Sequence, residues 1–411
     1  MIKESIMEKT GLPAGWEMKT LGDVSDFQRG LTYSGKDAVD FSENIVLRAT
    51  NIDLDKNCLD FSELKYLNNG FQVKQNKKIV KGGLLICLSS GSKKHLGKVA
   101  LVTDNYNYAF GGFIGQIIPD NQVVSKYLFY NLISVSYNKY ISRLTDGIGI
   151  NNLKSIDLKS FEFPLPPLTQ QKQIVGILDK AFAAIDTTKA NAGQNLQNAK
   201  ELFESYFQNI FENKGDDWKL VPFGQVCEIS GGSQPPKDNF IYEPREGYVR
   251  LVQVRDYRTD KYITYIPINK AKKFCKADDI MIGRYGPPIF GIFSGIEGAY
   301  NVALIKAIPN ESIINKEYIR WFLKTPNIVK FVEKTSKRAA GQDGVRKERL
   351  YEYNIPVPAF PEQKKIVETL DKLSLETKKL ESIYTQKIAD LEEMKKSVLQ
   401  KAFSGQLNTT N

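Results

Sequence analysis

The sequence predicts an α+β protein: two similar globular units separated by an antiparallel pair of long coiled-coil helices, with pseudo-twofold symmetry. Three observations predict this fold class. The chain of 411 residues repeats itself once, each repeat mixes short strand-like runs with a helical stretch, and each ends in a long amphipathic segment. Hydrophobic residues make up 42% of the chain and charged residues 25%, which suffices for more than one core.

The internal repeat consists of four short matches that occur in the same order in both halves of the chain. Each match is weak alone, but four in order indicate a tandem duplication of a unit of about 190–200 residues. The matched segments are 16–25 with 218–227, 81–91 with 276–286, 109–120 with 299–310, and 163–166 with 355–358.

Within each repeat, the globular part is predicted to contain short strands followed by a helical stretch. β-Branched and aromatic runs are broken by glycine pairs such as 82–83 and 231–232, which is typical of strands joined by turns. Helices are then predicted near 123–140 and 313–334. A proline cluster ends each globular part, because proline continues neither a helix nor a strand ladder.

A coiled-coil seam follows each proline cluster. Apolar or small residues recur at alternating steps of four and three, from Ile174 to Ile210 and again from Ile366 to Ala402. An extra step of four recurs at the same place in both copies and locally alters the supercoil. Each segment of about 43 residues predicts a rod of about 65 Å. The two copies are the expected partners, because an isolated helix would leave its seam in water.

Two questions about these helices stay open at this stage. Their length and their charged sides favour a spacer rod, whereas a helical hairpin that serves only as a core would show the same stripe. Large apolar side chains near the helix ends either form docking surfaces for partner chains or close the hairpin; they are Phe203, Phe207, Phe211, Leu399 and Phe403.

The predicted domain boundaries follow the proline clusters and the change of period. The first globular domain covers 1–168 and the first long helix 169–213, and the second globular domain covers 214–360 and the second long helix 361–405. Residues 406–411 form a short tail.

Charge and composition narrow the class of protein. Lysine and arginine number 57 against 47 acidic residues, and the net charge of +10 favours a polyanionic partner. A single histidine, His95, disfavours most histidine-activated nucleophiles and multi-histidine metal sites. Four scattered cysteines support neither a disulfide scaffold nor a zinc finger. Without a signal peptide or an apolar run of membrane-spanning length, we expect a cytoplasmic protein that does not enter membranes.

No motif assembles a reactive centre. The segment 91–99 resembles a phosphate-binding loop, but it has five residues between its glycines instead of four, and Val99 replaces the required Ser or Thr. Isolated carboxylates such as Asp278 and Asp279 are interpreted as turn residues and surface charges rather than metal ligands. We therefore predict no catalytic residue, no metal site and no cofactor in this chain.

The loops of the globular parts are rich in residues that suit the recognition of DNA. Arginine bonds guanine O6 and N7 in a bidentate manner, Asn and Gln do the same for adenine N6 and N7, and lysine holds phosphates. Solvated loops of a basic protein would have a similar composition. The candidate DNA-binding residues are Ser89, Ser92, Lys93, Lys94, His95, Arg143, Asn151 and Asn152 in the first repeat, and Arg250, Gln253, Arg255, Arg284, Tyr285, Arg338, Gln342 and Arg346 in the second.

The order of these parts resembles the specificity subunit of Type I restriction-modification systems. Members of that family carry two target-recognition domains, each followed by a long helix that starts with Pro-x-Pro-x-x-(Glu)-Gln-x-x-Ile. Segments 164–174 and 356–366 match this pattern, with Gln170 in place of Glu in the first copy. Segments 15–22 and 399–407 resemble the beginning and the ending of the family.

The resemblance implies that each globular domain reads one half of a split double-stranded DNA site, and that the helices hold the halves at a fixed separation. It implies two methyltransferase (modification) subunits as partners, which carry S-adenosylmethionine, and motor-nuclease (restriction) subunits, which use ATP and Mg. Two alternatives are a self-sufficient methyltransferase or nuclease, which would bind S-adenosylmethionine alone, and a coiled-coil scaffold, which would retard no DNA selectively.

Overall fold

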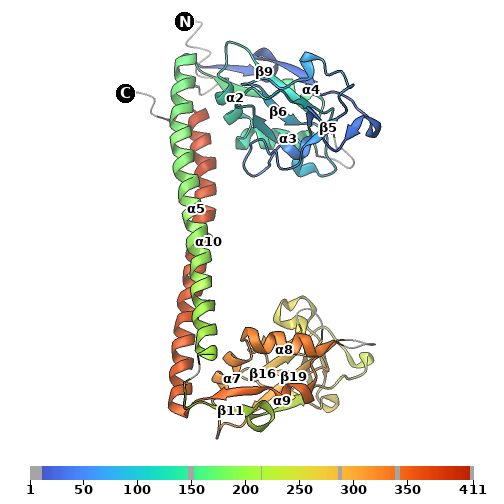
Figure 1. The fold of residues 1–411 in the computed structure, drawn as a ribbon, viewed down its shortest axis with the longest axis vertical. Helices are drawn as coiled ribbons and strands as arrows, with labels where there is room; N and C mark the ends of the chain where they lie inside the picture. The colour runs from blue at the N-terminus through green and yellow to red at the C-terminus, as the bar shows by residue number, and fades with distance from the viewer. Residues whose placement is uncertain (1–11, 147–151, 214, 286–288, 338–342, 408–411) are drawn as a thin grey trace. The chain divides into compact units, whose positions relative to one another are not determined.

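The computed structural model describes residues 12–146, 152–213, 215–285, 289–337 and 343–407. The chain divides into two compact units. The first unit contains residues 1–193 and 386–411, and the second contains residues 194–385. Each unit combines sheets with helices (Figure 1), so the α+β class is confirmed. Most elements of the first unit return in the same order in the second, which confirms the internal repeat.

Two four-stranded sheets and a two-stranded ribbon form the globular part of the first unit. The antiparallel sheet has the order β2 (Ser25–Arg29), β9 (Ile114–Pro119), β6 (Leu84–Cys87), β7 (Val99–Leu101). The second sheet has the order β3 (Ala38–Val39), β5 (Lys65–Leu67), β4 (Asn44–Leu47), β8 (Ala109–Phe110), and β4 and β8 run parallel. In the ribbon, β1 (Glu17–Thr20) pairs with β10 (Glu162–Leu165).

The second unit also has two four-stranded sheets and a two-stranded ribbon, and its second sheet is extended at the opposite edge. The antiparallel sheet has the order β12 (Cys227–Gly231), β19 (Leu304–Pro309), β16 (Ile280–Gly283), β17 (Ile292–Phe293). The second sheet has the order β14 (Tyr265–Pro267), β13 (Tyr248–Val252), β18 (Gly298–Tyr300), β15 (Phe274–Cys275), and β13 and β18 run parallel. The ribbon joins β11 (Lys219–Pro222) to β20 (Asn354–Val357).

Short 3-10 helices connect the strands of both units. Those of the first unit are η1 (Leu21–Asp23), η2 (Gly35–Asp37), η3 (Ala49–Asn51), η4 (Gln75–Lys77) and η5 (Lys93–His95). Those of the second are η6 (Lys237–Asn239), η7 (Val254–Tyr257), η8 (Asp260–Tyr262) and η9 (Ile268–Lys270).

Each single helix that the sequence predicts in the globular parts is two helices. In the first unit α2 (Ser125–Asn131) and α3 (Val135–Leu144) are separated, because the Ser134 hydroxyl accepts a hydrogen bond from the Tyr137 N–H (3.2 Å) and caps a new helix. In the second unit the pair is α7 (Lys316–Phe322) and α8 (Pro326–Ser336), and Pro326 at the first turn starts the second helix. The remaining short helices are α4 (Ser155–Lys159), α6 (Phe223–Val226) and α9 (Lys347–Glu352).

One of the four sequence matches is wrong by one residue. Leu84 pairs with Ile117 as Ile280 pairs with Ala307, so β6 and β16 align one position away from the match of 81–91 with 276–286. A slip of one residue exchanges the two faces of a strand, and only strand pairing reveals it.

The two long helices are continuous. α5 (Leu168–Glu212) has 45 residues and α10 (Phe360–Phe403) has 44. In the first unit the start of α5 lies beside the end of α10 (Figure 1), and Ile174 and Leu178 share a buried core with Leu399 and Ala402. In the second unit Phe207 of α5 shares a core with Leu370 of α10.

Ion pairs give the direction of the helix pair in the first unit. Asp186 contacts Lys395 (3.3 Å), and Lys189 contacts Glu392. Moving from one ion pair to the next, the residue number rises along α5 and falls along α10, so the two helices are antiparallel in this unit. Lys395, which the seam pattern places among apolar residues, lies over the Phe182 ring with its Nζ 4.8 Å from the centroid.

The ends of the helices face the globular parts. Phe207 and Leu399 are buried, and Phe203, Phe211 and Phe403 pack against the same cores. From the sequence, these residues are interpreted either as docking surfaces for partner chains or as residues that close the hairpin. Their burial fits the second interpretation. The seam also shifts near the end of α5. The steps of four and three from Ile174 place Tyr206 on the seam, but Tyr206 is 41% exposed and Phe207 is 8% exposed, because a straight α-helix drifts by about 20° per heptad. None of the described helices combines the length and apolar character needed to cross a membrane.

A buried glutamine joins each long helix to its globular part. The Gln171 Oε1 accepts from the Val124 N–H (2.8 Å), and its Nε2 donates to the Gln122 (3.0 Å) and Pro166 (2.8 Å) carbonyls. Gln363 makes the equivalent three bonds in the second unit: it accepts from the Asn315 N–H (2.6 Å), and its Nε2 donates to Ile313 (3.3 Å) and Pro358 (2.9 Å). The glutamine of the helix-start motif therefore fixes where the helix leaves the globular part.

A tryptophan reinforces each junction. The Trp16 Nε1 donates to the Gln170 Oε1 (2.9 Å), and the Trp218 Nε1 donates to the Glu362 Oε1 (3.1 Å). Gln170, the departure from the family pattern in the first copy, thus accepts the same bond as the usual glutamate.

Candidate nucleic-acid interface

In the first unit, the loop after β6 and the segment before α4 are brought together. Ser89 forms an antiparallel bridge with Asn152, and the Leu153 N–H donates to the Leu88 carbonyl (2.8 Å). Ser92, Lys93 and Lys94 are exposed on this loop. Two separate groups of predicted residues therefore share one surface. Asn151 lies outside the described residues.

His95 is half-buried within the same loop, at the end of η5. Burial lowers its pKa, and the nearby Lys98 and Lys94 lower it further. The neutral imidazole is thus favoured near pH 7, so His95 offers a ring donor and acceptor rather than a positive charge. Arg143 is exposed at the end of α3, where its Nε donates to the Lys139 carbonyl (3.4 Å).

The second unit has an equivalent junction after β16. The Arg284 N–H donates to the Ala303 carbonyl (2.8 Å), and the Val345 N–H donates to the Arg284 carbonyl (3.0 Å). The Arg284 guanidinium lies over the Tyr285 ring at 5.0 Å from its centroid, which holds both side chains together. The Arg346 Nη2 donates to the Lys337 carbonyl (3.1 Å). Arg338 and Gln342 lie outside the described residues.

Arg250 is half-buried and faces two carboxylates. Its Nε lies 3.5 Å from the buried Asp256 carboxylate and its Nη2 lies 3.6 Å from Asp260. Burial raises the pKa of Asp256, while the hydrogen bond from Gln253 and the charge of Arg250 oppose that rise. Arg250 is therefore placed to neutralise a buried carboxylate, a role that the sequence does not reveal.

Gln253 and Arg255 lie next to each other at the surface. The Gln253 Nε2 (3.2 Å) and the Arg255 Nη2 (3.3 Å) both donate to the Thr264 hydroxyl. The Arg255 guanidinium also lies over the Tyr262 ring, 5.4 Å from its centroid. Both side chains line a hollow of the second unit together with Gln234.

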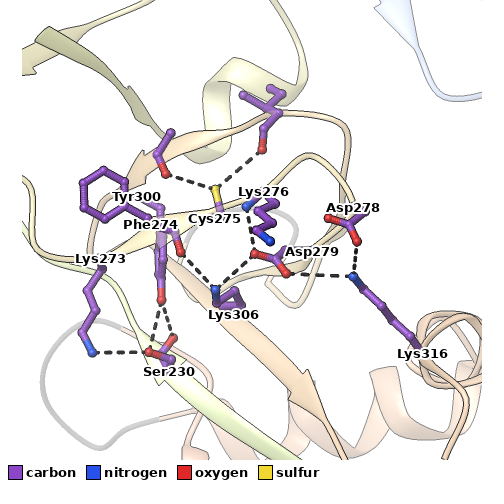
Figure 2. A network of polar contacts seen from close by, with 12 residues as sticks. Ser230, Lys273, Phe274, Cys275, Lys276, Asp278, Asp279, Tyr300, Lys306 and Lys316 are labelled. Atoms are coloured by element: carbon purple, nitrogen blue, oxygen red, sulfur yellow. Dashed lines mark hydrogen bonds and ion pairs between the residues drawn. The ribbon is translucent and has the colours of Figure 1, made fainter. Parts of the chain in front are cut away.

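The acidic pair before β16 is engaged by lysines (Figure 2). Asp279 accepts from the Lys276 N–H (2.9 Å) and from the Lys306 Nζ (3.1 Å), and Asp278 accepts from the Lys316 Nζ (2.7 Å). These bonds hold the turn into β16, the strand that ends next to Arg284. Across the described ranges, no group of three or more His, Cys, Asp or Glu side chains is arranged to hold a metal ion.

Sequence reasoning missed a surface of the first unit. A hollow there is lined by Thr32 and Tyr33 after β2, by Arg48 and Thr50 after β4, and by Phe113, which is 69% exposed. The Phe113 carbonyl accepts from the N–H groups of Leu88 (2.9 Å) and Ser89 (3.1 Å), so this hollow adjoins the predicted loop. The available signal was the position of Arg48 directly after a strand, which is also the position of Gln253.

The fold and this surface define a class of protein: a tandem repeat of α+β units, each joined to a long helix and each exposing basic, amide and aromatic side chains on its loops. The family model described as the Type I restriction modification DNA specificity domain matches residues 13–197 and 215–392. The chain belongs to this family.

Individual relatives agree with that assignment. The chain is 26% identical to the Type I restriction enzyme EcoKI specificity subunit of Escherichia coli K12, over 96% of this chain and 90% of that protein. It is 23% identical to the MjaVIII specificity subunit of Methanocaldococcus jannaschii, over 100% of this chain and 97% of that protein.

Solved structures show the same fold. The HsdS subunit of Thermoanaerobacter tengcongensis aligns with a TM-score of 0.63 and 19% identity, over 96% of this chain and 98% of that one. A chain from a structural study of the assembly and conformational transition of the type I R-M system aligns with a TM-score of 0.79 and 18% identity, over 96% of this chain and 99% of that one.

Proposed function

We propose that this chain is the DNA-recognition subunit of a Type I restriction-modification complex, and that each globular unit reads one half of a bipartite target. The observation that carries the proposal is the duplication itself. The same backbone frame occurs twice, while the side chains that its loops expose differ, as at Ser89 and Tyr285. A frame repeated with different surface groups suits the reading of two different short sequences.

The charge of the chain supports a DNA partner. Exposed lysines such as Lys93 and Lys94 are suited to phosphates, which position a protein without reading sequence. Arginine and amide side chains in the same regions, such as Arg284 and Gln253, are suited to base edges in the major groove.

The long helices would set the distance between the two half-sites. A continuous α-helix has a fixed rise of about 1.5 Å per residue, so its length is a constant of the sequence. Two readers joined by such a rod also gain avidity, because binding of one half raises the effective concentration of the other reader.

The chemistry of the complex is assigned to partner subunits. The name of the relatives, specificity subunit, implies a non-catalytic role. We infer that two methyltransferase subunits supply S-adenosylmethionine chemistry and that motor-nuclease subunits supply ATP- and Mg-dependent cleavage. This chain would direct both to the target and would bind none of these cofactors itself.

The test is selection of randomised DNA duplexes by the full chain together with its methyltransferase partner. We expect a bipartite motif with an unread gap, and no binding of S-adenosylmethionine to this chain alone in a calorimetric titration. Binding of S-adenosylmethionine by the isolated chain would favour a self-sufficient enzyme. Absence of sequence-selective retardation at every salt concentration would favour a scaffold without a DNA role.

A deletion tests the spacing role. Removing residues 186–192 from α5 and 389–395 from α10 shortens both helices by one heptad, and it removes both partners of the Asp186–Lys395 and Lys189–Glu392 ion pairs. A heptad is about 10 Å long, which corresponds to about three base pairs. The preferred gap should shorten by that amount while both half-sites are retained. An unchanged gap would contradict the spacing role.

A further inference from the structure

The two units contain equivalent hollows. In the first unit a hollow of about 570 Å³ lies between the segment after β2 and the segment after β4. In the second unit a hollow of about 750 Å³ lies between the segment after β12 and the segment after β13. β12 is the counterpart of β2, because their antiparallel sheets have the same order, and β13 is the counterpart of β4, because each is the strand that pairs in parallel with β18 or β8. The same place in the fold is therefore concave twice.

Close backbone packing occurs next to each hollow. A Cβ on Gly30 would lie 2.1 Å from the Gly111 carbonyl oxygen, and a Cβ on Gly232 would lie 1.9 Å from the Asn301 carbonyl oxygen. Only glycine permits this approach. Both glycines follow the first strand of their sheet, so the backbone next to each hollow is packed in the same way.

Arg48 and Gln253 occupy the same backbone position at these hollows. Arg48 follows β4 and precedes η3, and Gln253 follows β13 and precedes η7. The Arg48 N–H donates to the Asn51 Oδ1 (2.8 Å), and the Gln253 N–H donates to the Asp256 Oδ2 (3.3 Å). Asn51 and Asp256 are both buried, so each turn is held from below while residue 48 or 253 lines the hollow.

The chemistry of the linings differs between the units. In the first hollow Arg48 stands among apolar residues and residues with hydroxyl groups, and its Nε is enclosed without a hydrogen-bond partner in the described part of the chain. In the second hollow Gln253 is accompanied by Arg255, Lys237 and Gln234. Arginine matches the two acceptors of guanine, and glutamine matches the acceptor and donor of adenine. The positive groups favour a DNA duplex over a neutral occupant.

We propose that Arg48 and Gln253 are the equivalent specificity-determining residues of the two units, Arg48 selecting a guanine in one half-site and Gln253 an adenine in the other. This inference rests on the proposed function and makes it residue-specific. The difference between the half-sites then arises at one position of a shared frame.

The experiment is selection from randomised duplexes by the full chain with its methyltransferase partner, comparing wild type with Arg48→Ala and Gln253→Ala. Each substitution should relax one base position in one half-site by roughly 5- to 150-fold, the range for one bidentate contact, and leave the other half-site unchanged. Arg29→Ala and Arg349→Ala, at exposed arginines outside the hollows, are the controls and should change no base preference.

Two further variants keep the test independent of folding. Arg48→Lys retains the charge but loses the bidentate fork, so it should relax base choice while circular dichroism and thermal unfolding match wild type. The double variant Arg48→Gln with Gln253→Arg should exchange the guanine and adenine preferences of the two half-sites.

The possible outcomes separate the two proposals. If wild type selects a bipartite motif and folded Arg48 or Gln253 variants leave every base preference intact, or weaken all sequences equally, this assignment is wrong and the proposed function stands. If wild type selects no motif at all, the proposed function fails and the assignment fails with it.

Discussion

In the first unit the turn at the hollow is held by an amide, and in the second by an ion pair. The Asn51 Nδ2 donates to the Asp60 (2.8 Å) and Glu63 (2.9 Å) carbonyls, so one neutral side chain ties the turn to a neighbouring loop. Asp256 is instead faced by Arg250 at 3.5 Å, and burial raises its pKa. Two different chemistries thus hold one backbone shape.

The junctions with the long helices contrast with the hollows. Gln171 and Gln363 make the same three hydrogen bonds in the two units, and both are almost fully buried. The hollows share a frame but differ in side chains. The comparison teaches that packing and buried polar bonding restrict a position to one residue type, whereas a surface hollow tolerates residues as different as Arg48 and Gln253.

Among the substitutions that test whether equivalent positions behave alike, those in the apolar cores should change the free energy of unfolding most. Leu178 and Leu370 are equivalent, and both are fully buried. Leu178→Ala and Leu370→Ala should each lower the free energy of unfolding by about 2–5 kcal/mol, because a cavity is left behind. Hydrogen exchange should show the loss of protection in the first unit for Leu178→Ala and in the second for Leu370→Ala.

The matched control for these variants is Leu202→Ala, since Leu202 is 74% exposed on the same helix α5. It should be close to neutral. Equal loss of protection in both units from either core variant would show that the units do not respond as separate bodies.

A smaller effect is expected at the buried glutamines. Gln171→Leu or Gln363→Leu leaves buried backbone groups without partners and should cost about 1–3 kcal/mol, measured by urea unfolding. The two costs should be alike because the bonding is alike. The exposed Gln197→Leu serves as the control. A neutral result at Gln171 would remove the assigned role of the helix-start glutamine.

The smallest change in the free energy of unfolding is expected at the residues that accept a hydrogen bond from a tryptophan ring. Gln170→Glu places a negative charge in the first turn of α5, where the helix dipole and the Trp16 donor favour it, and should stabilise the first unit by about 0.3–1 kcal/mol. Glu362→Gln should destabilise the second unit by a similar amount. Both changes should shrink as salt is raised, and effects of the same sign in the two units would refute the interpretation.

Several features were predictable because they depend on spacing alone. Periodicity predicts the duplication, the two long helices and the proline-bounded junctions. It can be recognised even where the two repeats share few identical residues. The candidate residues after β6 and β16 were selected because loops rich in Arg, Asn and Lys stand out, and their role in binding stays a prediction. Asn151, Arg338 and Gln342 lie outside the described residues and stay predictions.

Other features depend on which backbone lies against which. Strand pairing decides the one-residue shift between β6 and β16, and a local cap decides the break between α2 and α3. Amino-acid composition indicates neither feature. Arg250 belongs in the candidate set by composition, and only the tertiary structure shows that it also faces the Asp256 and Asp260 carboxylates.

The sequence by itself determined that the chain is built twice and that each copy ends in a long amphipathic helix, because hydrophobic periodicity is a local property of the chain. Only the tertiary structure decided that Arg48 and Gln253 are counterparts, that Thr32 and Phe113 share a hollow with Arg48, and that two glutamines join each long helix to its globular part. These relations join segments that are distant in the sequence, and such contacts are set by strand pairing and packing rather than by the neighbours of each residue.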